Sequence, residues 1–521
     1  MEILKEIAYT LTRYQVRQVD VITNPDTKPS KKDNRYWEAY LGLREQQWQT
    51  DEEFAAHFGM EFPSKNYNRF KNELKERLWN TILFTQSIGR DYSDYMAVYH
   101  DLLQKWAIAE TLKQRAAVKA FWNLANDCLA VALKYELTKI IVDITTSMKA
   151  SSFMLPTMKK DYHRVKSVFE EYWPIYLAEV DLRNQYEQFI AEIAFAKGYK
   201  KDFAPAANLI VENFKEATSQ YHTHQLHFHY RLIHFYAKAL VHDWKGALTV
   251  ADEALSFFLE KKICPPLYII GLSHQKVSCL LMLGKFEEAK SELEETLKLT
   301  AADSSHHFKN RELATVNALY AGKYEEAWQI CKTALQHDRF AKIPLIDQEA
   351  WRIYYGYLYF LAQTKRFELP PQEKSNLPKL RLSSWLNDLP LYSLDKRGAQ
   401  IPVLILQTLL LFSEGRWDEL ENRIEALRKF RQRNLDPENE HYRTNCFIHL
   451  LELLPKYAHD LRALPAAAAP WLKKLAAGDF DILDRTYEIE VVPYERQWEW
   501  ILEMAGPVNK GARVQESMVQ G

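Results

Sequence analysis

Two short stretches of the sequence decide the fold: GKFEEA at residues 284–289 and GKYEEA at residues 322–327. A third relative, GRWDEL, occupies residues 415–420. In each stretch, a glycine suited to a left-handed helix cap precedes an aromatic residue and two acidic residues, which favour the first turn of a helix. The pattern predicts a junction between two helices, in which the aromatic side chain fills the space between them and alanine lets them approach closely.

Weaker copies of this junction extend the pattern towards the N-terminus. Phe203, Trp244, Phe286 and Tyr324 follow one another at spacings of 41, 42 and 38 residues. A period near 40 with two helices per repeat is typical of an α-solenoid. The residues predicted to pack between the helices are Phe203, Ala206, Trp244, Ala247, Phe286, Ala289, Tyr324, Ala327, Trp417 and Leu420.

The composition favours an all-α protein. Only 15 of the 521 residues are glycine, about 3% where globular chains average about 7%. Lys and Arg number 68 against 69 Asp and Glu, a balance that excludes a polybasic nucleic-acid coat and an acidic tail protein. Hydrophobic residues make up 47% of the chain, which excludes disorder throughout.

The repeated junctions resemble tetratricopeptide repeats (TPRs), whose second helix opens with G-x-[FY]-x-x-A. The resemblance covers residues 182–360 and, as one outlying helix pair, 401–435. It implies an all-α, TPR-like α-solenoid, a right-handed superhelix of helical hairpins with a helical N-terminal region and a C-terminal cap. The sequence is also similar to uncharacterised bacterial helical-repeat proteins.

The breaks in the helical pattern divide the chain into segments. Five prolines interrupt residues 367–402, which predicts an irregular connector. Before the last helix, Tyr487, Ile489 and Val491 alternate with glutamates, which predicts one short strand. We expect a helical region at 1–90, the solenoid at 91–366, the connector at 367–402, a helical repeat and cap at 403–505, and a flexible tail at 506–521.

The cysteines and the apolar runs indicate the cytoplasm. No CxxC pair occurs, so we expect reduced core thiols with neither disulfides nor a zinc site. The first residues include Glu2 and Glu6 and do not form a secretory signal. The longest apolar run, residues 402–412, is shorter than the roughly 20 residues of a membrane span. The five cysteines are Cys128, Cys264, Cys279, Cys331 and Cys446.

Residues 50–80 have the outline of a helix-turn-helix. TDEE at residues 50–53 is a capping box that starts a short helix ending at Gly59, and a second helix follows Ser64. The face opposite its apolar residues could contact phosphates and bases. It consists of Lys65, Asn68, Arg69, Asn72 and Lys75.

This outline resembles the DNA-reading modules that precede TPR arrays in peptide-sensing bacterial regulators. Glu73 and Glu76 dilute the basic face. The alternative interpretation is an ordinary helical hairpin whose second helix has a solvated outer face.

Six histidines gather between residues 222 and 242. Zinc requires three or four converging ligands, and the intervening aromatic and apolar residues favour packed histidines or histidines that line a groove. We therefore predict no metal. The histidines are His222, His224, His227, His229, His234 and His242.

The sequence contains none of the motifs GxxxxGK[ST], GxGxxG, HExxH and GxSxG, so it predicts no catalytic residue and no cofactor. Three functions remain open. The first is a cytoplasmic, non-enzymatic scaffold or adaptor that binds a protein or peptide in the solenoid groove. The second is a transcriptional regulator, with nucleic acid bound at residues 50–80 and a TPR-like sensor. The third is an enzyme with an unfamiliar active site. None of the three involves a membrane.

Overall fold

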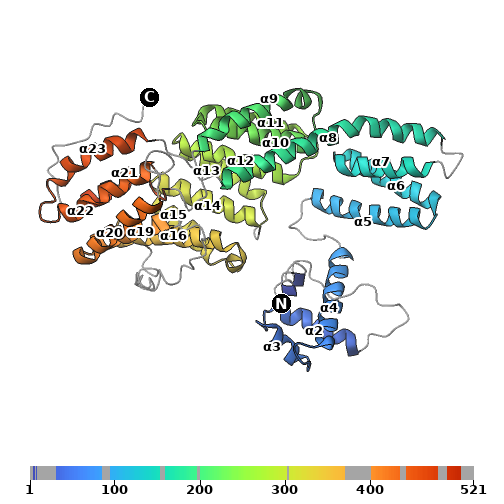
Figure 1. Ribbon diagram of the computed structural model, residues 1–521, viewed down its shortest axis with the longest axis horizontal. Helices are drawn as coiled ribbons and strands as arrows, with labels where there is room; N and C mark the ends of the chain where they lie inside the picture. The colour runs from blue at the N-terminus through green and yellow to red at the C-terminus, as the bar shows by residue number, and fades with distance from the viewer. Residues whose placement is uncertain are drawn as a thin grey trace. The chain divides into compact units, whose positions relative to one another are not determined.

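The computed structural model is helical throughout the residues that it describes, and these contain no β-strand (Figure 1). The chain divides into two compact units, Met1–Leu177 and Ala178–Gly521. The described residues are 4–5, 7–8, 31–84, 94–152, 159–195, 200–301, 304–369, 400–434, 442–478 and 490–505.

The first unit begins with a small module of three helices, α2 (Lys31–Arg44), α3 (Asp51–His57) and α4 (Lys65–Phe84). The predicted cap of α3 is present, because the Thr50 hydroxyl accepts a hydrogen bond from the Glu53 amide at 3.2 Å. The Glu53 carboxylate in turn accepts from the Gln49 amide at 2.7 Å, one residue before the partner that a capping box uses. The buried core includes Tyr36, Tyr40, Trp48, Phe54, Tyr67, Phe70, Leu74 and Leu78.

Three more helices of the first unit pack on one another in chain order: α5 (Asp94–Gln114), α6 (Val118–Lys134) and α7 (Thr138–Ser151). Their shared core contains the fully buried side chains of Phe121 and Ile141. The stacking of neighbouring helices therefore begins well before the region in which the sequence motif is visible.

The long helix α8 (Lys159–Phe195) joins the two units. Residues 175–195 contain neither glycine nor proline, so nothing in this stretch ends the helix. Pro174 lies inside α8 without ending it.

The second unit continues with helices that pack side by side in chain order. Consecutive helices are joined by short connections that reverse the chain, so the helices form stacked pairs. These helices are α9 (Ala204–Gln220), α10 (His224–Ala239), α11 (Trp244–Glu260), α12 (Pro266–Met282), α13 (Phe286–Lys298), α14 (Ser305–Tyr320), α15 (Tyr324–Leu335) and α16 (Leu345–Gln363).

The turn inside each pair has one backbone geometry. Gly284, Gly322 and Gly415 have φ angles of 69°, 73° and 67°, which confirms the predicted left-handed caps. In the α12–α13 turn, the Lys285 amide donates to the Leu280 carbonyl at 2.8 Å and the Gly284 amide to Leu281 at 3.1 Å, a Schellman motif. The same left-handed position is held by Ala116, Glu136, His242 and Lys365 in other turns.

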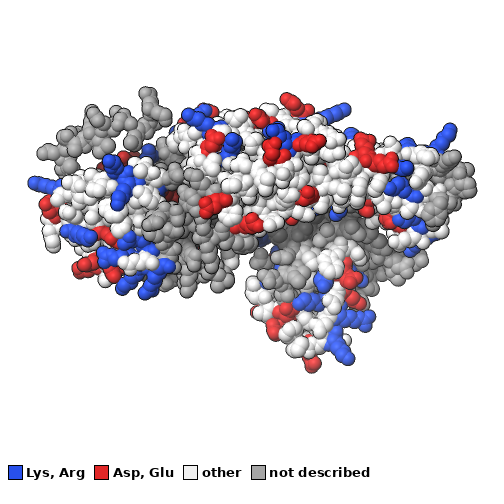
Figure 2. Space-filling view, turned by 45° about the horizontal axis from the view of Figure 1, so that its top comes forward, with Lys and Arg blue, Asp and Glu red and all other residues white. Residues whose placement is uncertain are grey.

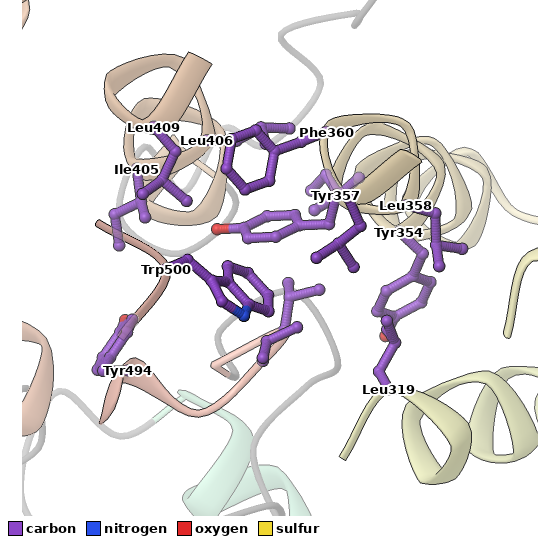
Figure 3. Packing of buried hydrophobic residues seen from close by; sticks show 14 of the residues in the cluster. Leu319, Tyr354, Tyr357, Leu358, Phe360, Ile405, Leu406, Leu409, Tyr494 and Trp500 are labelled. Atoms are coloured by element: carbon purple, nitrogen blue, oxygen red, sulfur yellow. The ribbon is translucent and has the colours of Figure 1, made fainter. Parts of the chain in front are cut away.

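The C-terminal helices pack around α24, the last helix. Trp500 of α24 lies beside Tyr357 and Phe360 of α16 (Figure 3), with the Phe360 and Trp500 ring centroids 5.9 Å apart, whereas the Tyr494 ring stacks on Phe447 of α21 at 4.3 Å. The Tyr320 hydroxyl donates to the Glu490 carbonyl at 2.7 Å, which ties the segment before α24 to α14. The helices are α19 (Gln400–Ser413), α20 (Trp417–Asn434), α21 (Tyr442–Leu451), α22 (Leu453–Lys456), α23 (Leu464–Ala477) and α24 (Tyr494–Met504).

Parts of three sequence predictions concern residues that the structure does not describe. Residues 370–399 of the connector, 487–489 of the predicted strand and the tail at 506–521 lie outside the described residues. The predicted connector is too long by three residues, because α19 begins at Gln400. Pro402 fits the first turn of this helix, where its missing amide proton leaves no hydrogen bond unmade.

Candidate functional site

The outer face of α4 is the first candidate site. Tyr67, Phe70, Leu74 and Leu78 recur at helical spacing and are buried in the module, so the opposite side of the helix must face solvent. Lys65, Asn68, Arg69 and Asn72 are exposed there. Lys75 is half-buried, with its ammonium group 4.8 Å from the centre of the exposed Trp79 ring. All five predicted residues therefore lie on one helix, four of them with free access to solvent.

Glu73 lies between this face and the core, and its carboxylate is 3.5 Å from the Arg69 guanidinium group, as the sequence prediction that it dilutes the face implies. It is only half exposed, and its carboxylate accepts a hydrogen bond from the buried Tyr36 hydroxyl. The Arg77 guanidinium stacks over the Tyr36 ring at 4.3 Å. Burial, and then the Glu73 carboxylate, raise the pKa of the Tyr36 hydroxyl above its usual range. A tyrosine 37 residues away thus draws this carboxylate towards the core, whereas Glu76 stays exposed.

Asp51 of α3, close to α4, is a second carboxylate that is neutralised within the module. Asp51 accepts hydrogen bonds from the Lys71 ammonium group at 2.6 Å and from the Tyr67 hydroxyl. Partial burial opposes ionisation, yet these hydrogen bonds lower the pKa of Asp51 to about 2. Lys71 therefore holds α3 against α4 and is not part of the outer face.

Two histidines of the cluster pack inside the second unit, whereas His222 is exposed. His224 and His227 are buried, and the His227 ring lies parallel to Phe257 at a centroid distance of 4.0 Å. Its Nε2 lies 3.1 Å from the Tyr221 carbonyl oxygen. Burial lowers the pKa of His227 to about 4. No three metal-ligating side chains converge anywhere in the described residues, and these histidines serve as aromatic packing groups.

The predicted packing residues lie at the pair junctions with one exception. Trp244, Ala247, Ala289, Ala327 and Leu420 are buried, and Phe203, Phe286, Tyr324 and Trp417 are partly buried. Ala206 is exposed, so its prediction is wrong, and its neighbour Ala207 is fully buried instead. Residues 200–203 form a 3₁₀ turn and Phe203 caps α9, which shifts the register by one residue.

An open cleft of about 440 Å³ lies where α24 meets the ends of α15 and α16. Arg366 donates to Glu503 at 2.5 Å, and its guanidinium group lies 5.2 Å from the centre of the Trp500 ring. No local sequence pattern marks this cleft, because Arg366 and Trp500 on its two walls are 134 residues apart in the chain. The lining residues are Tyr324, Thr364, Lys365, Arg366, Arg496, Glu499, Trp500, Glu503 and Met504.

Charge is otherwise distributed evenly. Lys and Arg side chains and Asp and Glu side chains lie interspersed over the described part of the face seen in Figure 2. Within the described residues, no helix combines the length and the apolar character needed to cross a membrane. No protein-family model, curated protein or solved structure matches this chain.

Proposed function

We propose that the protein is a cytoplasmic, non-enzymatic scaffold whose stacked helix pairs form a TPR-like, right-handed superhelix and bind a protein partner. The fold alone does not define a function. The observation that carries the proposal is a series of large apolar side chains left exposed at successive connections between helix pairs.

These side chains are leucines. Leu259 lies in the last turn of α11 and Leu267 in the first turn of α12, and they are 67% and 51% exposed. Leu299 follows α13 and Leu345 begins α16, at 43% and 45%. Because the helices of successive pairs alternate in direction, these connections lie along the same edge of the stack. Burying such side chains against a partner is favourable by about 25 cal/mol per Å², and exposed apolar patches commonly mark protein interfaces.

The α11–α12 connection carries positive charge. Lys261 and Lys262 lie between Leu259 and Leu267, whereas Lys298, which precedes Leu299, is paired with Glu295 at 2.5 Å. Lys261 is held in place, because its ammonium group donates to the His222 carbonyl. We infer that the partner presents apolar side chains with acidic residues at their margin.

The test is capture of the tagged full chain from its native lysate after nuclease treatment, read by mass spectrometry. A stoichiometric protein should be recovered with the wild type and lost with the double variant Leu259→Glu and Leu267→Glu. The matched control is Leu103→Glu with Ile108→Glu, two leucine-sized exposed residues of α5, which should keep the partner. Equal recovery with both double variants would refute binding along this edge.

A further inference from the structure

Four exposed polar residues occupy one side of α4 at spacings that bring them together. Lys65, Asn68, Arg69 and Asn72 stand at positions i, i+3, i+4 and i+7, which share one helical face. From Lys65 to Asn72, over eight residues, the helix rises about 10 Å. Cationic and amide side chains therefore alternate along a straight, rigid edge.

The cations of this face keep their charge available. No carboxylate lies within ion-pair distance of Lys65 in the described part of the chain. Arg69 approaches Glu73 at 3.5 Å, but its side chain is 77% exposed. The module instead uses Lys71 and Tyr67 to neutralise Asp51. Of the acidic groups near α4, Asp51 and Glu73 are paired within the module, whereas Glu76 is exposed beside the basic groups of this face.

From this arrangement we propose that the N-terminal module binds duplex DNA through the outer face of α4. Lys65, Arg69 and Lys75 contact phosphates, and the amides of Asn68 and Asn72 reach base edges, where an amide can both donate to and accept from adenine. A single α-helix about 10–12 Å across fits the major groove of B-DNA, about 12 Å wide. The deep, narrow major groove of duplex RNA does not admit it.

The module is built to hold that helix rigidly. Tyr67 and Phe70 pack against Phe54 of α3, and the Phe70 ring stacks on Tyr36 of α2 at a centroid distance of 4.9 Å. The Lys71–Asp51 ion pair and the hydrogen bonds Tyr67–Asp51 and Tyr36–Glu73 fix α4 through side chains that are buried or half-buried. Contacts on the outer face therefore do not compete with folding, and substitutions there leave the module intact.

The experiment measures fluorescence anisotropy of a labelled 30-base-pair duplex titrated with the full chain at several salt concentrations. The proposal expects affinity that falls steeply with salt. Lys65→Glu with Arg69→Glu should weaken binding by about tenfold or more and reduce the slope of log K against log salt by about two. The matched control is Lys429→Glu with Arg433→Glu, an equal change of charge on exposed residues of α20, which should bind as the wild type does.

Further measurements test sequence preference and distinguish DNA from other polyanions. Asn68→Ala with Asn72→Ala should preserve affinity for random duplex but flatten the preference among sequences selected from a random library. An equal loss of affinity in the α4 and α20 variants would overturn the proposal, because it would show a general charge effect. Binding of an RNA duplex or of heparin as tightly as DNA would overturn it as well. This test is independent of the repeat region, so it can fail while the scaffold proposal stands.

Discussion

The turns of α5–α7 and those of α12–α15 share a backbone but place side-chain volume in opposite positions. In the α14–α15 turn, left-handed Gly322 precedes Tyr324 at the first helical position and fully buried Ala327 three residues later. In the α5–α6 turn, left-handed Ala116 precedes the smaller Val118, and fully buried Phe121 stands three residues later. The large and the small residue have exchanged places.

The α6–α7 turn repeats this exchange. Glu136 is left-handed, Thr138 begins α7 and the fully buried Ile141 follows three residues later. The element that recurs along the chain is therefore the reversing turn together with a constant volume between the two helices. The sequence motif is visible only where glycine occupies the turn and an aromatic residue occupies the first helical position.

The largest effect should come from removing the volume of Phe121. Phe121→Ala leaves a cavity among α5, α6 and α7, and we expect a loss of about 3–5 kcal/mol in the free energy of unfolding. Chemical denaturation followed by circular dichroism measures it. The double variant Val118→Phe with Phe121→Ala reproduces the volume order of the α14–α15 turn and should recover part of this loss. If the double variant is no more stable than Phe121→Ala, the two turns do not share one packing rule.

Much of the fold could be predicted from the sequence, because glycine identifies the left-handed turns at 284, 322 and 415. The turns at Ala116, Glu136, His242 and Lys365 carry no such mark. Their conformation costs about 1–2 kcal/mol for a residue with a side chain, and tertiary packing enforces it. The predicted solenoid at 91–366 includes α5–α7, but no turn motif marks the positions at which these helices reverse.

The candidate site was predictable in part for a similar reason. Helical spacing places Lys65, Asn68, Arg69 and Asn72 on one face. The inward position of Glu73 depends on Tyr36, whose location relative to α4 follows only from the folded core. The cleft beside α24 depends likewise on contacts between Arg366 and Glu503, 137 residues apart.

The two regions also differ in their histidine content, so we expect the stability of α10–α14 to depend on pH more strongly than that of α6 and α7. Helices α6 and α7 contain none, whereas burial lowers the pKa of both His227 and His274 in α10 and α12 to about 4. Unfolding restores the usual value near 6.5, so the unfolded chain binds protons first. Stability is thus full above about pH 6.5 and falls until about pH 4.

Each of these histidines should lower the free energy of unfolding by on the order of 1–2 kcal/mol between pH 7 and pH 5. This value allows for partial screening by solvent. Hydrogen exchange corrected for its intrinsic pH dependence measures the effect helix by helix. Protection in α10–α14 should fall, whereas α6 and α7 should keep theirs. His274→Gln should make the fall shallower. Equal loss of protection in both regions would assign acid sensitivity to other groups.

The smallest effect concerns the turns themselves. A methyl group added at Gly284 meets nothing within 4 Å, so Gly284→Ala should lose only the cost of the left-handed backbone, about 1 kcal/mol. Ala116 is exposed and left-handed. Ala116→Gly should therefore raise the free energy of unfolding by up to about 1 kcal/mol, because glycine relieves the same backbone cost. The entropy that glycine adds to the unfolded chain reduces this gain. Denaturation midpoints of the two variants measure both changes. Opposite signs would show that one turn geometry governs both regions, whereas a loss in both variants would show that side-chain packing at Ala116 outweighs its backbone.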